Sequence, residues 1–174
     1  MNPDFNIRLA TPEDAGAIAE IYTQGIDDRV ATFETAHRTA GDIRRRIEEK
    51  GDRFPTIVVV DERQVIAWSS AGPYRDRPCY SGVAEHSVYV HREARGRGAG
   101  RLALSGLIEA YEQRGFWKLL SRIFPENQAS IKLHQTLGFR IVGVYEKHAQ
   151  LDGAWRDVVI VERLLGVGKQ ESRP

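Results

Sequence analysis

The chain has little of what several protein classes require. It contains one cysteine, Cys79, among 174 residues, so an internal disulfide and a cysteine metal cage are excluded. A single thiol suits a reducing compartment, and we expect a cytoplasmic protein. No apolar run approaches the ~20 residues that span a bilayer. Residues Met1 to Asn6 also lack the basic-then-apolar pattern of a secretory signal. We therefore expect no membrane partner.

Net charge is also nearly absent. Lysine and arginine total 25 against 24 for aspartate and glutamate, which leaves a formal charge of +1. Without a strong global field, we expect no nucleic-acid partner. No pair of histidines has metal-ligand spacing, so we expect no metal. Basic residues gather only locally, between Arg92 and Arg101, and this cluster needs its own explanation.

Hydrophobic periodicity predicts an α/β domain over residues 1–165, with 166–174 as a frayed C-terminal tail. A capping pattern at Thr11-Pro12-Glu13-Asp14 marks the first helix start, and Asp152-Gly153 marks a late hairpin turn. The element order predicts early and late antiparallel hairpins around a central parallel strand–helix–strand unit. The expected strands are 7–9, 56–60, 65–71, 83–90, 118–124, 139–145 and 156–161, and the expected helices lie around 12–26, 40–50, 99–115 and 127–137.

The most informative segment follows the strand that ends at Val90. Gly96, Gly98 and Gly100 alternate with other residues and lead directly into a helix. Glycines let backbone N–H groups turn toward a ligand, and a helix N-terminus adds unpaired donors and partial positive charge. With charge from Arg95, Arg97 and Arg101, the segment predicts a pyrophosphate-sized anion cradle. The alternative is a glycine-rich turn with a solvated basic face. The spacing fits neither a nucleotide P-loop nor a Rossmann fingerprint.

Two motifs in order resemble those of the GCN5-related N-acetyltransferase (GNAT) superfamily. The first is Arg95-x-x-Gly98-x-Gly100 after the strand Val88-Tyr89-Val90, and it resembles the superfamily's acetyl-CoA pyrophosphate loop. The second is Asn127-x-x-Ser130-x-x-Leu133-His134-x-x-x-Gly138-Phe139. The resemblance covers Ile7 to Leu165. It implies the GNAT fold, a mixed, mostly antiparallel twisted sheet with helices on both faces, and acetyl-CoA as cosubstrate. It also places the cofactor site where the two central parallel strands diverge.

Within the superfamily, the chain resembles the phosphinothricin and arsinothricin N-acetyltransferases. The matching segments are 31–35, 72–77, 84–90 and 133–138, and segments 115–127 and 144–158 look most like the arsinothricin branch. This resemblance implies acetylation of the α-amine of a glutamate-analogue toxin, which would confer resistance, and a homodimer. Methionine sulfoximine or sulfone is a further candidate substrate. Two rival hypotheses remain: an acetyltransferase for another amine, and a non-catalytic coenzyme A-binding sensor.

Two residues are candidates for catalysis. Glu85 is a carboxylate within a strand otherwise built for burial, where desolvation raises a carboxyl pKa. The resemblance implies that Glu85 is the general base; the alternative is a structural ion pair with a loop arginine such as Arg75. By the same resemblance, His134 stands where most superfamily members carry a tyrosine thought to protonate the leaving thiolate. His134 could instead act as a general base together with Glu85, or its role could be purely structural.

The remaining candidates divide between cofactor and substrate. The backbone of Val88 and Val90 should pair with the pantetheine arm like an added strand. The predicted cofactor set is Val88, Val90, Arg95, Gly96, Arg97, Gly98, Gly100, Arg101, Asn127 and Ser130; Asn127 could also act only as a helix cap.

For the substrate, the guanidinium groups of Arg75 and Arg77 suit a carboxylate, phosphinate or arsonate-like oxyanion, although both could be solvated loop residues. Phe33, Thr35, Tyr74, Tyr80 and Tyr89 could wall a pocket; the aromatic ones could equally belong to the core or to a dimer interface.

Overall fold

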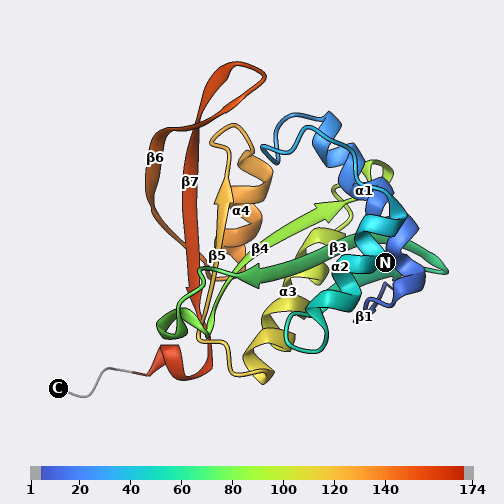
Figure 1. Ribbon diagram of the computed structural model, residues 1–174, viewed down its shortest axis with the longest axis horizontal. Helices are drawn as coiled ribbons and strands as arrows, with labels where there is room; N and C mark the ends of the chain where they lie inside the picture. The colour runs from blue at the N-terminus through green and yellow to red at the C-terminus, as the bar shows by residue number, and fades with distance from the viewer. Residues whose placement is uncertain (1–4, 171–174) are drawn as a thin grey trace.

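The computed structural model describes residues 5–170. Its seven strands form one sheet in the order β1-β2-β3-β4-β5-β7-β6, and every neighbouring pair except β4 and β5 is antiparallel. The strands are β1 (Asn6–Leu9), β2 (Thr56–Asp61), β3 (Gln64–Pro73), β4 (Val83–Val90), β5 (Lys118–Ile123), β6 (Arg140–Leu151) and β7 (Ala154–Leu164), coloured along the chain in Figure 1. The expected mixed, mostly antiparallel sheet is confirmed.

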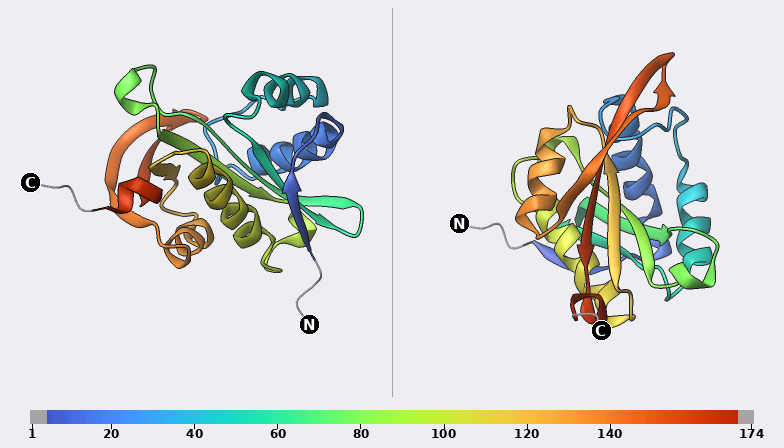
Figure 2. Two further views of the ribbon diagram at one scale, coloured as in Figure 1. Left: turned by 90° about the horizontal axis from the view of Figure 1, so that it is seen from below. Right: turned by 90° about the vertical axis from the view of Figure 1, so that its left-hand side faces the viewer.

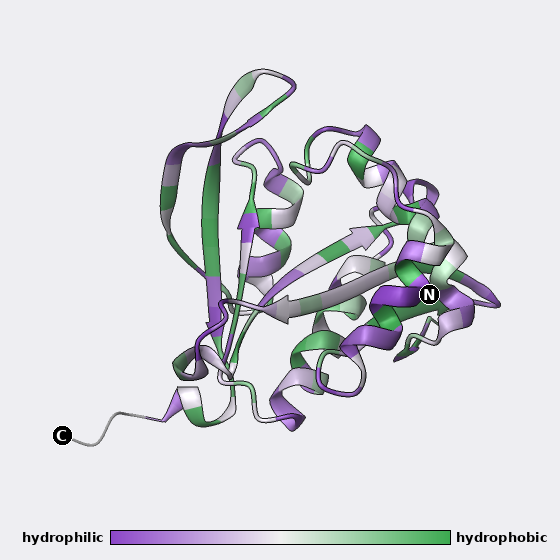
Figure 3. Cartoon of the chain, in the orientation of Figure 1, coloured by the Kyte–Doolittle hydropathy of each residue, from purple (hydrophilic) through white to green (hydrophobic). Residues whose placement is uncertain are grey.

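Helices cover both faces of this sheet. Helices α1 (Ala15–Asp27) and α2 (Ala40–Lys50) lie on one face, and α3 (Ala99–Gln113) and α4 (Gln128–Thr136) lie on the other, as the left view of Figure 2 shows. Strand β2 is buried on both sides, because Val58 and Val60 pack toward α1 while Ile57 packs toward α3. Figure 3 shows the resulting pattern, with hydrophobic residues concentrated on the strands and hydrophilic ones at the outer turns.

Local sequence signals account for most element boundaries. Thr39 caps α2 by accepting a hydrogen bond from the Asp42 amide, in a capping box. Thr11 begins a short 3-10 turn, Pro12–Asp14, that leads into α1, with Pro12 in its first position. The Asp152–Gly153 turn has φ values of 49° and 77°, the left-handed conformation that tight hairpins prefer. No helix among residues 5–170 combines the length and apolar content needed to cross a membrane.

Two expectations differ from the structure. Strands β6 and β7 extend further than predicted, to Leu151 and from Ala154, because a register shift beyond Tyr145 carries a polar stretch into the hairpin. The predicted frayed tail begins instead as a 3-10 turn, Gly166–Lys169, whose first and last residues donate hydrogen bonds to the Glu112 carboxylate. Residues 171–174 lie outside the described part of the chain.

The parallel β4–β5 pair positions the site. Its ladder holds only three residue pairs, from Val83 with Lys118 to Glu85 with Leu120. Beyond Glu85 the two strands separate, while β4 stays paired with β3 as far as Val90. At the fork, the Ser121 hydroxyl donates to the His86 carbonyl over 2.9 Å. The far half of β4 therefore presents one unpaired backbone edge to the space between the strands. This confirms the expected divergence of the central strands.

Candidate active site

A cavity of about 430 Å³ occupies the fork between β4 and β5 and reaches the N-terminus of α3. It gathers nearly the whole predicted cofactor set: Val88, Val90, Arg95, Gly96, Gly98, Gly100, Arg101, Asn127 and Ser130 all line it. These residues come from three separate segments of the chain, so their convergence depends on the fold rather than on sequence proximity. The only predicted member that does not line the cavity is Arg97.

The N-terminus of α3 can accept an anion at this cavity. Helix α3 begins after Gly98, which has a φ of +87° and, as glycine, no side chain to cap the first turn. Gly96, with a φ of +76°, also adopts the left-handed conformation that other residues avoid. The first-turn amides of a helix have no intrahelical acceptors, so they are available to an anionic group at the positive end of the helix dipole. The loop therefore fits a diphosphate.

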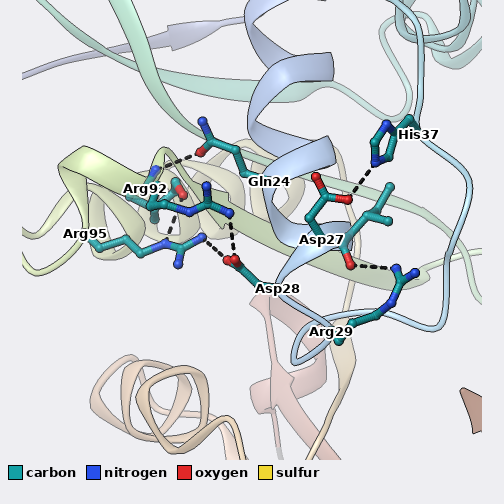
Figure 4. A network of polar contacts seen from close by, with 9 residues as sticks. Gln24, Asp27, Asp28, Arg29, His37, Arg92 and Arg95 are labelled. Carbon is teal, nitrogen blue, oxygen red and sulfur yellow. Dashed lines mark hydrogen bonds and ion pairs between the residues drawn. The ribbon is translucent and has the colours of Figure 1, made fainter. Parts of the chain in front are cut away.

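The arginines of this loop have internal partners. Arg92 and Arg95 both donate to the Asp28 carboxylate, over 2.8 and 2.6 Å, at the end of α1 (Figure 4). Burial raises the pKa of Asp28, but the hydrogen bonds from Arg95 and Arg92 outweigh it and leave the pKa lowered. Asp28 lines the same cavity, so it holds Arg95 at the cavity wall.

The structure corrects the expectation for Arg97. Its guanidinium donates to Asp61 over 2.8 Å, at the turn between β2 and β3, and lies 5.1 Å from the centre of the Phe5 ring. The left-handed glycines on either side turn this residue away from its neighbour Arg95. The partner Asp61 is 36 positions earlier in the chain and could not be read from the loop.

The second motif contributes the other wall of the cavity. The Asn127 side chain accepts a hydrogen bond from the Ser130 amide over 3.2 Å and so caps α4. Both residues also line the cavity. Asn127 is thus a helix cap at the cavity wall, and the two alternatives weighed for it are compatible.

Glu85 is ion-paired, but not with Arg75. Arg122 on β5 donates to both of its oxygens, over 2.7 and 2.6 Å, in a bidentate pair at the β4–β5 fork. The hydrogen bond to Glu85 raises the pKa of Arg122. The Glu85 side chain remains 27% exposed, so it is less buried than its strand context indicates. Each oxygen keeps a second lone pair for a further donor.

His134 lies in a buried histidine pair. Its Nδ1 is 2.7 Å from the Ser130 carbonyl oxygen, and its Nε2 is 2.9 Å from Nε2 of His86. Because a carbonyl only accepts, we assign the proton to Nδ1 of His134, and Nε2 then accepts from His86. Burial lowers the pKa of both rings, and each is neutral at pH 7. Both ring nitrogens of His134 are therefore occupied in this arrangement.

A second cavity, of about 140 Å³, lies on the opposite face of the sheet, beneath α2. Glu85, Ser87 and Tyr89 line it from β4. A small space of about 40 Å³ between the strands, lined by Ser87, Tyr89, Arg122 and His134 among others, shares residues with both cavities. The three spaces thus lie next to one another, from the α3 N-terminus, through the fork, to Glu85.

Most of the predicted substrate residues lie apart from these cavities. Arg75 and Arg77 are exposed in the β3–β4 loop, where Arg75 lies over the Tyr74 ring and Tyr74 packs edge-on against Tyr80. Thr35 is exposed as well.

Of the two remaining substrate candidates, Phe33 packs against Phe124, so it belongs to a small hydrophobic cluster. Only Tyr89 lines the cavities, and burial raises the pKa of its hydroxyl. The described geometry thus assembles the cofactor side and leaves most of the predicted substrate residues dispersed.

Comparison with known proteins decides the family. A model described as the Acetyltransferase (GNAT) family matches residues 19–139. The chain belongs to the GNAT acetyltransferase family. The predicted GNAT fold and the prediction of an acetyltransferase are confirmed at this level.

Similar GNAT proteins cover almost the whole chain. The L-amino acid N-acyltransferase MnaT of Escherichia coli is 32% identical, across 91% of this chain and 92% of that protein. An L-methionine sulfoximine/L-methionine sulfone acetyltransferase of Salmonella typhimurium is 31% identical, across 91% and 93%. A GNAT phosphinothricin acetyltransferase of Sinorhizobium meliloti, solved with acetyl-CoA, superposes with a TM-score of 0.90 at 31% identity and covers 100% of this chain and 94% of its own.

Several residues of this GNAT site were not predicted from the sequence. Arg122, Asp28 and His86 join it only through tertiary contacts, and no local motif marks them. The position of Lys50 could have been predicted from the sequence. It follows Ile43 and Ile47 at helical spacing, so it continues the stripe of α2 that faces the sheet.

Proposed function

We propose that this chain transfers the acetyl group of acetyl-CoA to the α-amine of a glutamate-analogue amino acid, phosphinothricin or arsinothricin, and so detoxifies it. The observation that carries the proposal is the series of three neighbouring spaces across the sheet. They extend from a helix N-terminus suited to an anion on one face to a carboxylate, Glu85, on the other. The names of similar proteins, which act on L-amino acids, methionine sulfone or phosphinothricin, support the amino-acid class.

On the cofactor side, the chain offers three sets of groups for acetyl-CoA. The first-turn amides of α3, with Arg95 and Arg101, face the cavity where a diphosphate would lie. The free backbone edge of Val88 to Val90 offers hydrogen bonds to the amides of the pantetheine arm. The cosubstrate supplies the activated thioester. These residues bind and orient it.

On the acceptor side, Glu85 removes the proton that makes the amine unreactive. The amine nitrogen then forms a bond to the acetyl carbon and loses its second proton, the carbon–sulfur bond breaks, and a proton ends on the thiolate to give the coenzyme A thiol. Arg122 orients the carboxylate through two hydrogen bonds and leaves a free lone pair on each oxygen for the ammonium. Direct transfer needs no nucleophile from the chain, and Cys79 has no part in it.

His134 remains the proposed proton donor to the thiolate. It lines the small space in the fork, next to Ser87 and Tyr89. With its proton on Nδ1, the neutral ring of His134 has none on Nε2. To donate from Nε2 it must first take a proton there, such as the second proton lost by the amine nitrogen, and then exchange the contact with His86 for one with the sulfur. We expect His134→Ala to lower kcat more than it weakens coenzyme A binding, as measured by steady-state kinetics and calorimetry. If kcat is unchanged, His134 is only structural.

We also propose a homodimer. Strands β6 and β7 carry exposed large apolar side chains, Ile141, Val142, Val144, Tyr145 and Trp155, all at least 44% exposed. Exposed apolar patches of this kind mark association surfaces. Light scattering at micromolar concentration should give twice the chain mass. A monomer there would remove this part of the proposal.

The main test is thiol release from acetyl-CoA with a panel of amines: phosphinothricin, arsinothricin, methionine sulfone, glutamate and a polyamine. Glu85→Gln keeps the shape but cannot accept the proton, so kcat should fall at least 100-fold while the dissociation constant of acetyl-CoA changes less than threefold. An unaltered rate removes Glu85 as the base. Binding of acetyl-CoA without turnover of any amine would favour the rival hypothesis, a sensor.

A further inference from the structure

The cavity beneath α2 contains polar groups that proton transfer by Glu85 does not use. Lys50 enters it from the last turn of α2, Trp68 and Ser70 from β3, and Ser87 from β4. The rest of its lining is mixed: Ile18, Ile43 and Tyr22 are among the apolar contributors, and Arg46 and Glu85 are charged. A cavity of this kind holds a small ligand group that is partly apolar and partly polar.

Lys50 brings a positive charge to this cavity. Its Nζ donates to the Ser70 hydroxyl over 2.7 Å, and no carboxylate of residues 5–170 forms an ion pair with it. The only carboxylate in the cavity lining, Glu85, is engaged by Arg122. An ammonium has three N–H donors, so Lys50 keeps donors for a ligand. Burial first, and repulsion from Arg46 second, lowers the pKa of Lys50 to about 8. A positive charge is thus kept in a place that disfavours it.

A neutral donor accompanies this charge. The Ser70 oxygen accepts from both Lys50 and Thr56, which leaves its own O–H to donate elsewhere. Trp68 also lines the cavity, but its indole Nε1 is shielded from solvent and has no hydrogen-bond partner among the described residues, so Trp68 contributes to the wall of the cavity. Lys50 and Ser70 together indicate a ligand that accepts hydrogen bonds.

We propose that this cavity is the subsite for an anionic side-chain end of the acceptor amino acid, with Lys50 as its charged partner and Ser70 as a neutral donor. The inference rests on the proposed function and names its substrate class. The preferred acceptors are amino acids whose side chains end in a phosphinate, carboxylate or similar oxyanion, rather than in a neutral group.

The strand register supports this placement. Ser70 lies opposite Ser87, and the next pair on the same face is Gly72 with Glu85. Two residues along a strand span about 7 Å. In a glutamate-like acceptor, four bonds of about 1.5 Å join the amine nitrogen to the terminal carbon or phosphorus. An amine at Glu85 therefore places the far end of the acceptor near Ser70 and Lys50. Beyond Glu85 in the other direction, β3 ends at Pro73 and the loop that carries Arg75 begins.

The test compares two acceptors with the same amino-acid head and different tails, phosphinothricin with an anionic phosphinate and methionine sulfone with a neutral sulfone. Lys50→Met removes the charge and keeps most of the volume. We expect kcat/KM for phosphinothricin to fall at least tenfold and that for methionine sulfone to change less than twofold. Lys50→Arg should restore part of the loss. Arg44→Met, on the exposed face of α2, is the matched control and should alter neither acceptor.

A loss that is equal for both acceptors, or no loss, would overturn the assignment of Lys50. Calorimetric titration of phosphinothricin into the wild-type protein and into Lys50→Met separates this inference from the proposed function. If the wild type binds phosphinothricin and Lys50→Met does not, while neither acetylates it, the subsite stands and the proposed reaction fails. If phosphinothricin binds both proteins equally, or binds neither, the subsite is wrong whatever the turnover.

Discussion

Removing the Lys50 charge should make the ligand-free protein more stable. In the folded chain, burial lowers the pKa of Lys50 from 10.5 to about 8. At about 1.4 kcal/mol per pKa unit, this corresponds to about 3 kcal/mol of unfavourable free energy at neutral pH. Lys50→Met abolishes this term. It also loses the hydrogen bond to Ser70, worth about 1 kcal/mol. We expect a net gain in the free energy of unfolding of about 2 kcal/mol at pH 7.

The pH dependence identifies the cause. The folded-state pKa is lowered, so the folded chain binds fewer protons than the unfolded chain between about pH 8 and 10.5. The penalty is therefore fully present below about pH 8 and disappears as the pH rises toward 10.5. Urea unfolding of both proteins at pH 7 and pH 10 measures it. The difference in favour of Lys50→Met should fall by about 2.5 kcal/mol between the two, so that the advantage is gone at pH 10. A variant that is less stable at pH 7, or an advantage independent of pH, would refute this reasoning.

Two matched pairs give further predictions. Arg95→Ala removes a charged donor from the cofactor cavity and should weaken coenzyme A binding about tenfold in calorimetry. Arg97→Ala should change the affinity less than twofold. Equal effects would contradict the placement of Arg95 at the cavity and Arg97 away from it. Gly16→Ala on α1, with open space around it, should stabilise the chain by about 0.5 kcal/mol. Gly25→Ala on the same helix places a methyl 2.6 Å from the Tyr89 ring. It should lower the free energy of unfolding in urea by about 1–3 kcal/mol and also lower kcat/KM. Equal stability of the two glycine variants would refute this prediction.

Local signals were enough to predict most of the fold. The continuous β-branched run of β2, the cap at Thr39 and the turn at Asp152 each depend on residues that are neighbours in the chain. At the hairpin, the end of β6 was placed too early and the start of β7 too late, because a bulged hairpin rich in polar residues has no clean alternation. The 3-10 turn at Gly166–Lys169 was not predicted because the acceptor of its hydrogen bonds, Glu112, lies more than fifty residues away.

The candidate site also has parts that local sequence determines and parts that only tertiary contacts determine. The glycine loop and Asn127 were predicted because each belongs to a motif of residues close together in the chain. The partner of Glu85 was not, because Arg122 reaches it through the register of two parallel strands. Equally, nothing near Arg97 in the sequence indicates that Asp61 will draw it away from the cavity. When a charged side chain has several possible partners, the tertiary fold decides which one it pairs with.

The three-pair ladder between β4 and β5 has a mechanical consequence. Few main-chain hydrogen bonds join the half of the sheet made by β1 to β4 to the half made by β5 to β7. A short seam of this kind opens at a lower free energy than the long ladders on either side of it. A molecule that contacts Val90 on one half and Ser130 on the other would hold the two halves of the sheet together. Amide hydrogen exchange at Leu120 should then slow when coenzyme A binds, even though Leu120 does not line the cavity.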